Sequence, residues 1–223
     1  MIDPKDIDWN LVWKSQVEEN RASSPGRDCA RIWESRESAL RFWNMCRKER
    51  SRIDQTVWET DMSPSSRVLD IGAGPGTLAI PFAQKAAHVT AIEPAEGMCS
   101  VMKEKMAEFA VSNIDIVQKR WEDVDIASDL SGPYDVVIAS FSLGMGDIQS
   151  AVEKMVGALS PLSLRWPFIL GYTMADLMAK TARQALPARP QERCALQCAL
   201  SDGNLPQHQI FPAGAQPALW FSG

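Results

Sequence analysis

The stretch that decides the fold occupies residues 67–77 and reads Arg-Val-Leu-Asp-Ile-Gly-Ala-Gly-Pro-Gly-Thr. Its first three residues are typical of an apolar strand, and Thr77 to Ile80 is typical of a helix start, so the glycines lie in the turn between them. Glycine lets the backbone approach a ligand closely, and the first turn of a helix offers unpaired N–H groups. The sequence therefore predicts a corner that binds a nucleotide-like ligand. A tight strand–helix turn without a ligand is the alternative that the rest of the chain has to exclude.

The spacing of the glycines distinguishes between two classes of ligand. A dinucleotide-binding turn follows G-x-G-x-x-G, and its third glycine would fall at position 77, where this chain has Thr77. The third glycine is Gly76 instead, and Asp70 stands two residues before Gly72. This D-x-G-x-G-x-G pattern resembles motif I of class I S-adenosylmethionine (SAM) methyltransferases. The resemblance implies SAM as the cofactor, with its methionine end held by Asp70, Gly72, Ala73, Gly74 and Gly76.

The segment after the corner agrees with this resemblance. Residues 88–92 are predicted to form a second strand, and Glu93 follows it, 23 residues after Asp70. An acid about 20 residues beyond such a corner binds ribose hydroxyls, since a carboxylate can accept two hydrogen bonds from a vicinal diol. Glu93 is therefore the predicted ribose ligand, and a solvated acid at a strand end is the alternative. A helix from Met98 to Ala110 comes next. Met98 resembles the family's apolar residue beside the adenine ring, but it could equally be an ordinary core methionine.

A third predicted strand, residues 114–117, leads into Lys-Arg-Trp-Glu-Asp-Val at residues 119–124. Many family members carry a short acid here that accepts a hydrogen bond from the adenine amino group, but this chain has Arg120 at that place. We therefore expect Trp121 and Glu122 to surround the adenine, through backbone groups or through the indole itself. Trp121 could equally be a packing residue.

The fourth predicted strand, residues 134–139, is almost continuously apolar, which is typical of a parallel strand covered on both faces. Open α/β sheets place their reaction crevice at the carboxyl ends of the strands, so Ser140 and Phe141 are expected to face it. A helix is predicted over residues 147–159. The Asn-Pro-Pro-Tyr type motif of enzymes that methylate amide or adenine nitrogens is absent, which argues against those acceptors. No general base is evident, because His88 lies at the wrong end of its strand.

The resemblance covers about residues 65–160 with four motifs in order, and its finer pattern resembles an uncharacterised archaeal-type subgroup. It implies an α/β fold, a Rossmann-like, doubly wound, mostly parallel sheet. It also implies transfer of a methyl group by in-line displacement to an unidentified small-molecule acceptor. Two other classes stay open: a non-catalytic SAM-binding remnant, and a nicotinamide-dependent oxidoreductase, which Thr77 disfavours.

Residues 1–64 are predicted to be a helical extension or cap in front of residues 65–161, the predicted SAM-binding core. Residues 37–60 are typical of a helix, and they carry a basic cluster made of Arg47, Lys48, Arg50 and Arg52. We interpret this cluster as a solvated helix face rather than a contact for an anionic partner. The extension also holds five of the eight tryptophans, which either pack the helices or line an apolar lid: Trp9, Trp13, Trp33, Trp43 and Trp58.

The composition changes after Ser160. Residues 165–223 hold only five basic and three acidic residues, and the strands that complete such a sheet are not evident there. A reading frame shifted by one base near residues 160–165 explains this, because Met-Ala at 174–175 and again at 178–179 can only yield Trp in that frame. We therefore expect 162–223 to be an aberrant or poorly ordered tail, with a divergent natural C-terminus as the alternative. The fourth strand would then have an exposed apolar edge, and activity would be weak or absent.

Composition limits the remaining possibilities. The formal net charge is −5, so no general attraction to polyanions and no nucleic-acid partner are expected. No signal peptide opens the chain and no apolar run reaches 18 residues, so we predict no membrane association. Five cysteines at irregular spacing favour reduced thiols and a cytoplasmic location. We predict no metal site, although Cys194, Cys198 and His208 lie near one another in the sequence.

Overall fold

The computed structural model describes residues 8–23, 29–48, 50–160 and 168–170. Four helices come first: α1 (Trp9–Ser23), α2 (Cys29–Ile32), α3 (Arg36–Lys48) and α4 (Arg50–Glu59). The following elements alternate between strand and helix: β1 (Arg67–Ile71), α5 (Ala79–Ala83), β2 (His88–Ile92), α6 (Glu96–Glu108), β3 (Ile114–Val117), the 3-10 helix η2 (Trp121–Asp123), α7 (Ile126–Asp129), β4 (Val136–Ser140), α8 (Ile148–Ala158) and β5 (Phe168–Leu170).

The strands form one sheet in the order β3-β2-β1-β4-β5, and every described pairing is parallel. In the register, Asp70 of β1 lies opposite Ala91 of β2 and Ile138 of β4. The chain proceeds to one side of β1 first and to the other side afterwards, so the end of β1 is the point where the strand order reverses. Ligands of open α/β sheets bind at that point. The predicted Rossmann-like, doubly wound sheet is confirmed.

Helices cover both faces of the sheet, as the apolar sequence of β4 predicts. Successive strand residues point to opposite faces. Val68 and Ile138 pack with α3, α4, α5 and α6 in one buried cluster. Leu69 and Val137 pack on the other face in a second cluster, with η2 and α8. Asp70 is two residues from Val68 and so belongs to the face that α6 covers.

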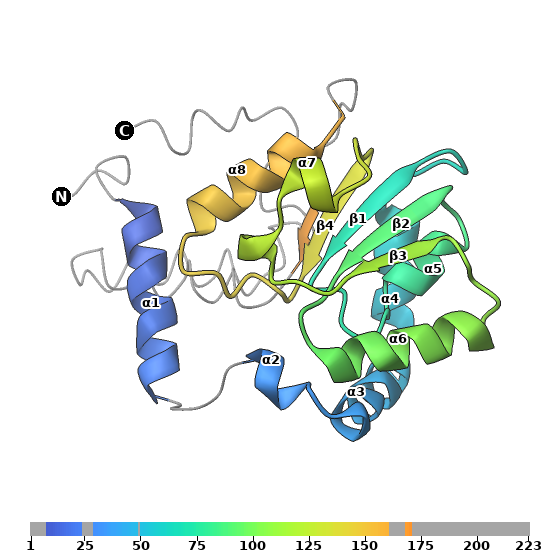
Figure 1. Cartoon of the computed structure of the whole chain (residues 1–223), viewed down its shortest axis with the longest axis horizontal. Helices are drawn as coiled ribbons and strands as arrows, with labels where there is room; N and C mark the ends of the chain where they lie inside the picture. Colours follow the sequence, from blue (N-terminus) through green and yellow to red (C-terminus); the bar gives the residue numbers. More distant parts are fainter. Residues whose placement is uncertain (1–7, 24–28, 49, 161–167, 171–223) are drawn as a thin grey trace, which may run out of the picture.

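The N-terminal helices attach on both sides of the sheet (Figure 1). Helix α1 lies against α8 and helix α3 lies against α6. Trp13 of α1 and Trp43 of α3 are buried, and Trp33 packs against the same core as Trp43, so these three tryptophans pack helices. Trp58 is 82% exposed and does not. Of the basic cluster, Arg47 is exposed, and the side chains of the other three lie outside the described residues.

The element bounds follow the sequence prediction closely. Strands β2 and β3 have the predicted bounds, and β4 begins two residues later than predicted. The range predicted to be helical, residues 37–60, is helical in α3 and α4, which lie on either side of residue 49, and that residue is not described. The domain boundaries at residues 64 and 161 stay predictions.

The prediction that β4 has an unpaired edge was wrong. Strand β5, Phe168–Leu170, pairs in parallel with β4 from Ile138 to Ser140. The backbone of any extended triplet can complete the hydrogen-bond ladder at an open strand edge. A three-residue run lacks the length at which a strand pattern becomes evident in a sequence. Residues 161–167 and 171–223, on which the reading-frame hypothesis also rests, lie outside the described residues.

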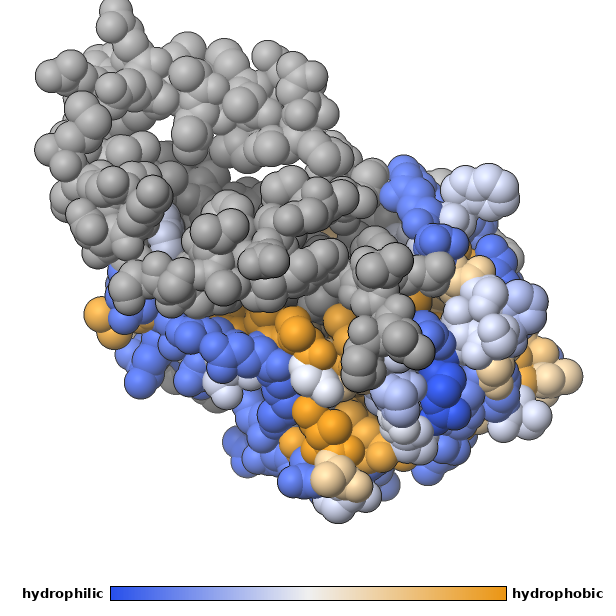
Figure 2. Space-filling model, turned by 90° about the horizontal axis from the view of Figure 1, so that it is seen from above, coloured by the Kyte–Doolittle hydropathy of each residue, from blue (hydrophilic) through white to orange (hydrophobic). Residues whose placement is uncertain are grey.

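The surface combines hydrophilic and hydrophobic areas on the face seen from above (Figure 2). Leu11, Met45 and Trp58 are the most exposed of the large apolar side chains in the described part of the chain. No helix described here combines the length and hydropathy that a membrane span requires.

Residues 33–35 cross over the first turn of α6 at Gly97. A Cβ atom there would lie 2.6 Å from the carbonyl oxygens of Trp33 and Glu34, which are backbone atoms and cannot rotate away. We expect Gly97→Ala to lower the free energy of unfolding by about 1–3 kcal/mol in urea titrations, because the added methyl displaces the segment.

Gly157 on α8 provides the matched control. A Cβ there would meet only Ile126, at an ordinary 3.6 Å. Gly157→Ala should therefore raise the free energy of unfolding by about 0.5–1 kcal/mol, the usual effect of replacing glycine within a helix. Equal effects of the two substitutions would contradict the packing of residues 33–35 on α6.

Candidate functional site

Three left-handed glycines shape the corner after β1. Gly72, Gly74 and Gly76 have φ angles of +70°, +57° and +85°, a region that other residues rarely adopt. The N–H groups of Gly72 and Ala73 both donate to the carbonyl of Ile92, at 2.8 and 3.0 Å, so the corner is tied to the end of β2. The backbone therefore turns sharply where β1 and β2 end.

Two of the glycines also make room for neighbouring protein atoms. A Cβ on Gly72 would overlap the Cβ of Ser142, whose hydroxyl donates to the carbonyl of Ile71 at 2.6 Å. A Cβ on Gly76 would lie 2.8 Å from the Cγ of Met102 on α6. These two positions are therefore glycine because the chain itself crowds them.

Gly74 differs from the other two. The only described atom within 4 Å of a Cβ placed there is a ring carbon of Phe42 on α3, at 4.0 Å. The ring of Phe42 contacts Trp33 edge to face at 5.1 Å between centroids. Since no atom of the described residues fills the space beside Gly74, its left-handed backbone leaves room for a ligand next to the corner.

Two buried carboxyl groups lie beside this corner. Asp70 is 1% exposed and Glu93 is 7% exposed. Glu93 accepts hydrogen bonds on both oxygens, from the N–H of Gly74 at 2.9 Å and from the N–H of Ala95 at 2.8 Å. The Oδ2 atom of Asp70 is buried and has no hydrogen-bond partner among the described residues. The pair thus consists of one well-bonded carboxylate and one with an unused oxygen.

Burial raises the pKa of both acids. Burial, and then the negative charge of Glu93, raise the pKa of Asp70 to about 7. The pKa of Glu93 is raised by burial and is lowered in part by the hydrogen bonds from Ala95 and Gly74. Perturbed carboxyl groups of this kind concentrate at functional sites, because their environment disfavours the charged form until a ligand compensates it.

The residues predicted to surround the adenine are buried to different degrees. Met98 is 3% exposed in the core cluster beneath α6. Trp121 is 2% exposed, and its indole N–H donates to the carbonyl of Ala151 at 3.1 Å. Those contacts are the ones a packing residue makes, the alternative that the sequence left open for both. Glu122 is exposed.

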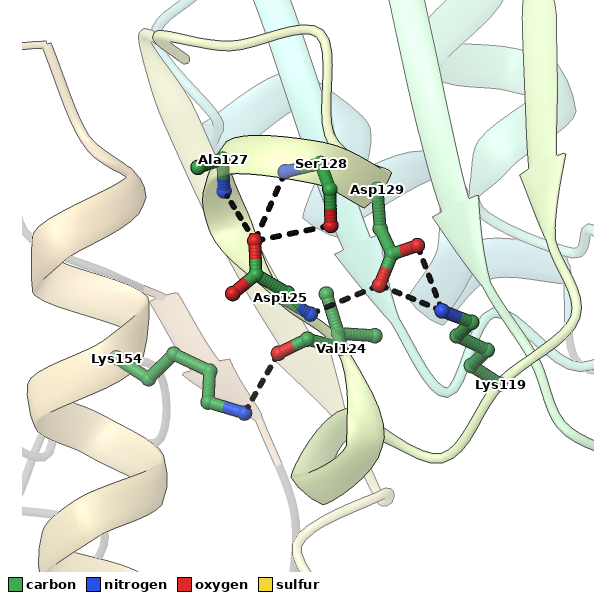
Figure 3. A network of polar contacts seen from close by, with 7 residues as sticks. All are labelled: Lys119, Val124, Asp125, Ala127, Ser128, Asp129 and Lys154. Carbon is green, nitrogen blue, oxygen red and sulfur yellow. Dashed lines mark hydrogen bonds and ion pairs between the residues drawn. The ribbon is translucent and has the colours of Figure 1, made fainter.

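A polar network holds the segment that carries Trp121 and Glu122 (Figure 3). Lys119 donates to the carboxylate of Asp129, which also accepts from the backbone of Asp125. Asp125 caps α7 by accepting from the N–H groups of residues 127 and 128. Lys154 of α8 donates to the carbonyls of Trp121, Glu122 and Val124. The backbone after β3 is therefore fixed relative to α8.

Ser140 and Phe141 lie at the carboxyl end of β4, next to the corner. Ser140 is the last residue of β4 and is partly buried. Phe141 is 50% exposed and has a φ angle of +56°, which is strained for a bulky residue. Such strain concentrates at functional sites, and the neighbouring Ser142 fixes the loop to the corner.

Helix α1 fixes the far end of the same loop. The indole N–H of Trp13 donates to the carbonyl of Met145 at 2.7 Å in a buried contact. Asn10 accepts from the N–H of Gln149 and donates to Asp147, the residue that caps α8. The loop between β4 and α8 is thus anchored to the glycine corner at one end and to α1 at the other.

Sequence reasoning missed several of these residues. Ser142, Phe42 and Asn10 give no local signal, because each acts on a partner far away in the chain. Gly97 was available as a signal, since a glycine within the first turn of a predicted helix suggests close approach of another segment.

Comparison with known proteins agrees with this geometry. Residues 68–162 match the family model described as a methyltransferase domain. This match begins in β1 and ends just after α8, so it takes in the glycine corner, Glu93 and the end of β4. The cofactor that this match supports is SAM.

Curated relatives share parts of the chain. An uncharacterized protein of Haemophilus influenzae is 30% identical over 112 residues, which cover 50% of this chain and 41% of that protein. Ribosomal RNA small subunit methyltransferase A of Thermotoga neapolitana is 35% identical over 74 residues, which cover 33% of this chain and 26% of that protein. The matched part of the chain thus spans less than half the length of these relatives.

A solved structure shares the fold of this chain. A protein of Methanococcus maripaludis, described as a candidate SAM-dependent methyltransferase, superposes with a TM-score of 0.51 at 17% identity. The match covers 77% of this chain and 80% of that protein. At this identity the likeness establishes the fold.

The pKa of Asp70 predicts how the stability of the ligand-free domain depends on pH. This pKa is about 7 in the folded chain, whereas the ordinary value for an aspartate is 3.8. The folded state therefore binds more protons than the unfolded state between these values, and stability falls as pH rises through them. Asp70→Asn removes this penalty. Urea titrations give the free energy of unfolding of the variant and of the unsubstituted chain at each pH. We expect the difference, variant minus unsubstituted chain, to increase by on the order of 2 kcal/mol from pH 5 to pH 8.

Glu18→Gln is the control for this titration, because Glu18 is an exposed acid on α1. Its stability relative to the unsubstituted chain should not follow the trend of the Asp70 variant. A pH-independent difference for Asp70→Asn would contradict the raised pKa.

Trp13→Phe tests the anchor between α1 and the loop after β4. Phenylalanine keeps most of the packing but cannot donate to the carbonyl of Met145, and a buried unpaired carbonyl costs about 1–3 kcal/mol. We expect lower stability by about that amount and faster amide hydrogen exchange in residues 143–149. Trp58→Phe, at an 82% exposed site, should change neither measurement. Unchanged exchange in Trp13→Phe would show that the indole N–H does not hold the loop.

Proposed function

We propose that this chain is a SAM-dependent methyltransferase that acts on a small-molecule acceptor. The observation that carries the proposal is the corner after β1, where the ring of Phe42 is the nearest of the described groups to the space beside Gly74. The two buried carboxyl groups beside it supply acceptors for the polar groups of the cofactor. The residues present therefore fit SAM.

Each part of the cofactor has partners in this arrangement. Asp70 has an unused buried oxygen for the methionine end, and the glycine backbone permits close approach. Glu93 follows β2, and its bonds from Gly74 and Ala95 hold its carboxylate beside the corner, where it can also accept from ribose hydroxyls. The backbone around Glu122 and the Met98 side of α6 would flank the adenine.

The chain's contribution to catalysis is mainly positioning. When bound, SAM supplies a methyl group that its sulfonium already activates for in-line displacement. Ser140 and the strained Phe141 are the residues that would face the acceptor, since they end the strand beside the corner. Anchoring their loop at Ser142 and at Trp13 keeps it in one geometry, and alignment of the reacting groups is worth several kcal/mol of the barrier.

The N-terminal helices favour a small acceptor. Residues 33–35 cross over the start of α6, and α1 crosses the loop after β4, so both contacts lie where strands of the sheet end. A cap at that edge leaves less room for a structured RNA than an open edge does. A ribosomal RNA acceptor is the second candidate, favoured by the sequence likeness to the Thermotoga neapolitana enzyme.

Calorimetric titration with S-adenosylhomocysteine, the product form of SAM, tests the proposal, with NAD as the control ligand. Binding at micromolar strength with no response to NAD supports it. Transfer of a labelled methyl group from SAM to a small-molecule extract or to an RNA fraction then distinguishes the two acceptor classes. Binding without transfer to any fraction would favour a non-catalytic SAM-binding protein.

Glu93→Gln should weaken S-adenosylhomocysteine binding at least about tenfold, which corresponds to about 1.4 kcal/mol. A glutamine amide has only one oxygen, so it cannot accept from Gly74, Ala95 and the ribose as the carboxylate does. Glu108→Gln, at the C-terminal end of α6, is the control and should bind as the unsubstituted chain does. Equal affinity of both variants would remove Glu93 from the cofactor site.

A further inference from the structure

Asp70 occupies an unusual position for an acidic residue. It lies within the central strand β1, between β2 and β4, and is 1% exposed. Its Oδ2 atom is buried and accepts no hydrogen bond from any described residue. A buried carboxylate without partners is costly, and the group commonly takes up a proton instead.

Among the described residues, the groups near Asp70 do not compensate a negative charge on it. The charge that acts on it is the negative one of Glu93, which lies beyond β2. Cys99 of α6 is neutral at physiological pH, because burial raises the pKa of its thiol to about 11. Glu96 and Lys103 of α6 act on Cys99 with opposite signs. Neither β4 nor α5, the other elements beside this part of β1, carries a titratable side chain.

The hydrogen bonds decide which of the two acids holds the charge. Glu93 accepts from two backbone N–H groups, which stabilise its ionised form. Asp70 has no such donors on its buried oxygen. The burial of Asp70 and the negative charge of Glu93 raise the pKa of Asp70 to about 7, which agrees with this division.

We propose that ligand binding at this corner is coupled to the loss of one proton from Asp70, which exchanges its own proton for the ammonium group of the ligand's amino-acid end. In the ligand-free site the O–H bond of Asp70 is intact. When the ammonium group arrives, that bond breaks, the proton passes to solvent, and the carboxylate accepts an N–H bond from the ammonium. This inference rests on the proposed function, because it requires the methionine end of the cofactor to lie at the corner.

The exchange makes binding depend on pH in a defined direction. Below the pKa of Asp70 the ligand must expel a proton, so affinity rises with pH and then levels off above it. With the pKa at about 7, S-adenosylhomocysteine should bind about eightfold more tightly at pH 7.5 than at pH 6. 5′-Methylthioadenosine keeps the adenosine and the sulfur but lacks the amino acid. Its affinity should therefore not show the increase with pH that Asp70 causes.

Proton release is measured directly by calorimetry of the full chain. Titrations with S-adenosylhomocysteine at pH 7, in two buffers of different ionisation enthalpy, give the number of protons released on binding. We expect about half a proton at pH 7, and fewer at pH 7.5. Any contribution from Glu93 through the ribose appears equally with 5′-methylthioadenosine, so the difference between the two ligands isolates Asp70.

Two variants assign the proton to its residue. Asp70→Asn keeps the size of the side chain but has no ionisable proton. It should bind 5′-methylthioadenosine as before, bind S-adenosylhomocysteine more weakly at pH 7.5, and release no additional proton. Asp115→Asn, on the exposed side of β3, should behave as the unsubstituted chain does.

The outcomes separate this inference from the proposed function. If S-adenosylhomocysteine binds and the two ligands release equal numbers of protons, the exchange at Asp70 is wrong while the cofactor assignment stands. If Asp70→Asn still releases the additional proton, another group supplies it and the inference is wrong. If neither ligand binds, the cofactor site itself is wrong. The measurements on the unsubstituted chain decide the matter even where Asp70→Asn does not fold.

Discussion

The site depends on one backbone constraint, the left-handed turn at Gly72. With a φ angle of +70°, the chain leaves β1 sideways, and the place of a Gly72 side chain is taken by Ser142 from the loop after β4. The hydroxyl of Ser142 then bonds the carbonyl of Ile71, the last residue of β1. The turn therefore brings the ends of two neighbouring strands into contact. An L-residue at Gly72 would both strain the turn and separate the two strand ends.

The N-terminal helices extend this arrangement to the loops. Helix α3 contributes Phe42 beside Gly74, and residues 33–35 rest on Gly97 of α6. Helix α1 reaches the other side of the sheet and holds the loop after β4 through Trp13. The described helices before β1 thus contact both the glycine corner and the loop after β4. A shift of α1 or of α3 would be transmitted to the corner and to this loop, since packed elements move as units.

The sequence predicts local features of this fold well and long-range features poorly, for a physical reason. Strands β2 and β3 have apolar patterns bounded by turn residues, and the corner after β1 needs glycine at fixed positions, so their signals are complete within a few residues. Asn10 accepts a hydrogen bond from the N–H of Gln149, which lies far away in the sequence. A polar residue on a helix does not indicate which distant residue will be its partner. Strand β5 is three residues long and is defined by the edge of β4 rather than by its own pattern. The chemical state of Asp70 could not be predicted either, because it depends on burial and on Glu93 together.

The pairing of Asp70 with Glu93 shows how binding and stability oppose each other in this domain. Two buried acids side by side destabilise the ligand-free fold, because burial disfavours the charged form of each and the negative charge of Glu93 acts on Asp70. Replacing them with apolar residues of similar size would remove that penalty, and it would also remove the acceptors for a cationic, hydroxyl-bearing ligand. Glu93 is held by the Gly74 and Ala95 backbone whether or not a ligand is present, so its orientation costs nothing at the moment of binding. Asp70, without such donors, is the group whose environment improves most when a positively charged group arrives. Much of the selectivity of the corner for a positively charged ligand then comes from the buried Asp70 oxygen, which has no hydrogen-bond donor when the ligand is absent.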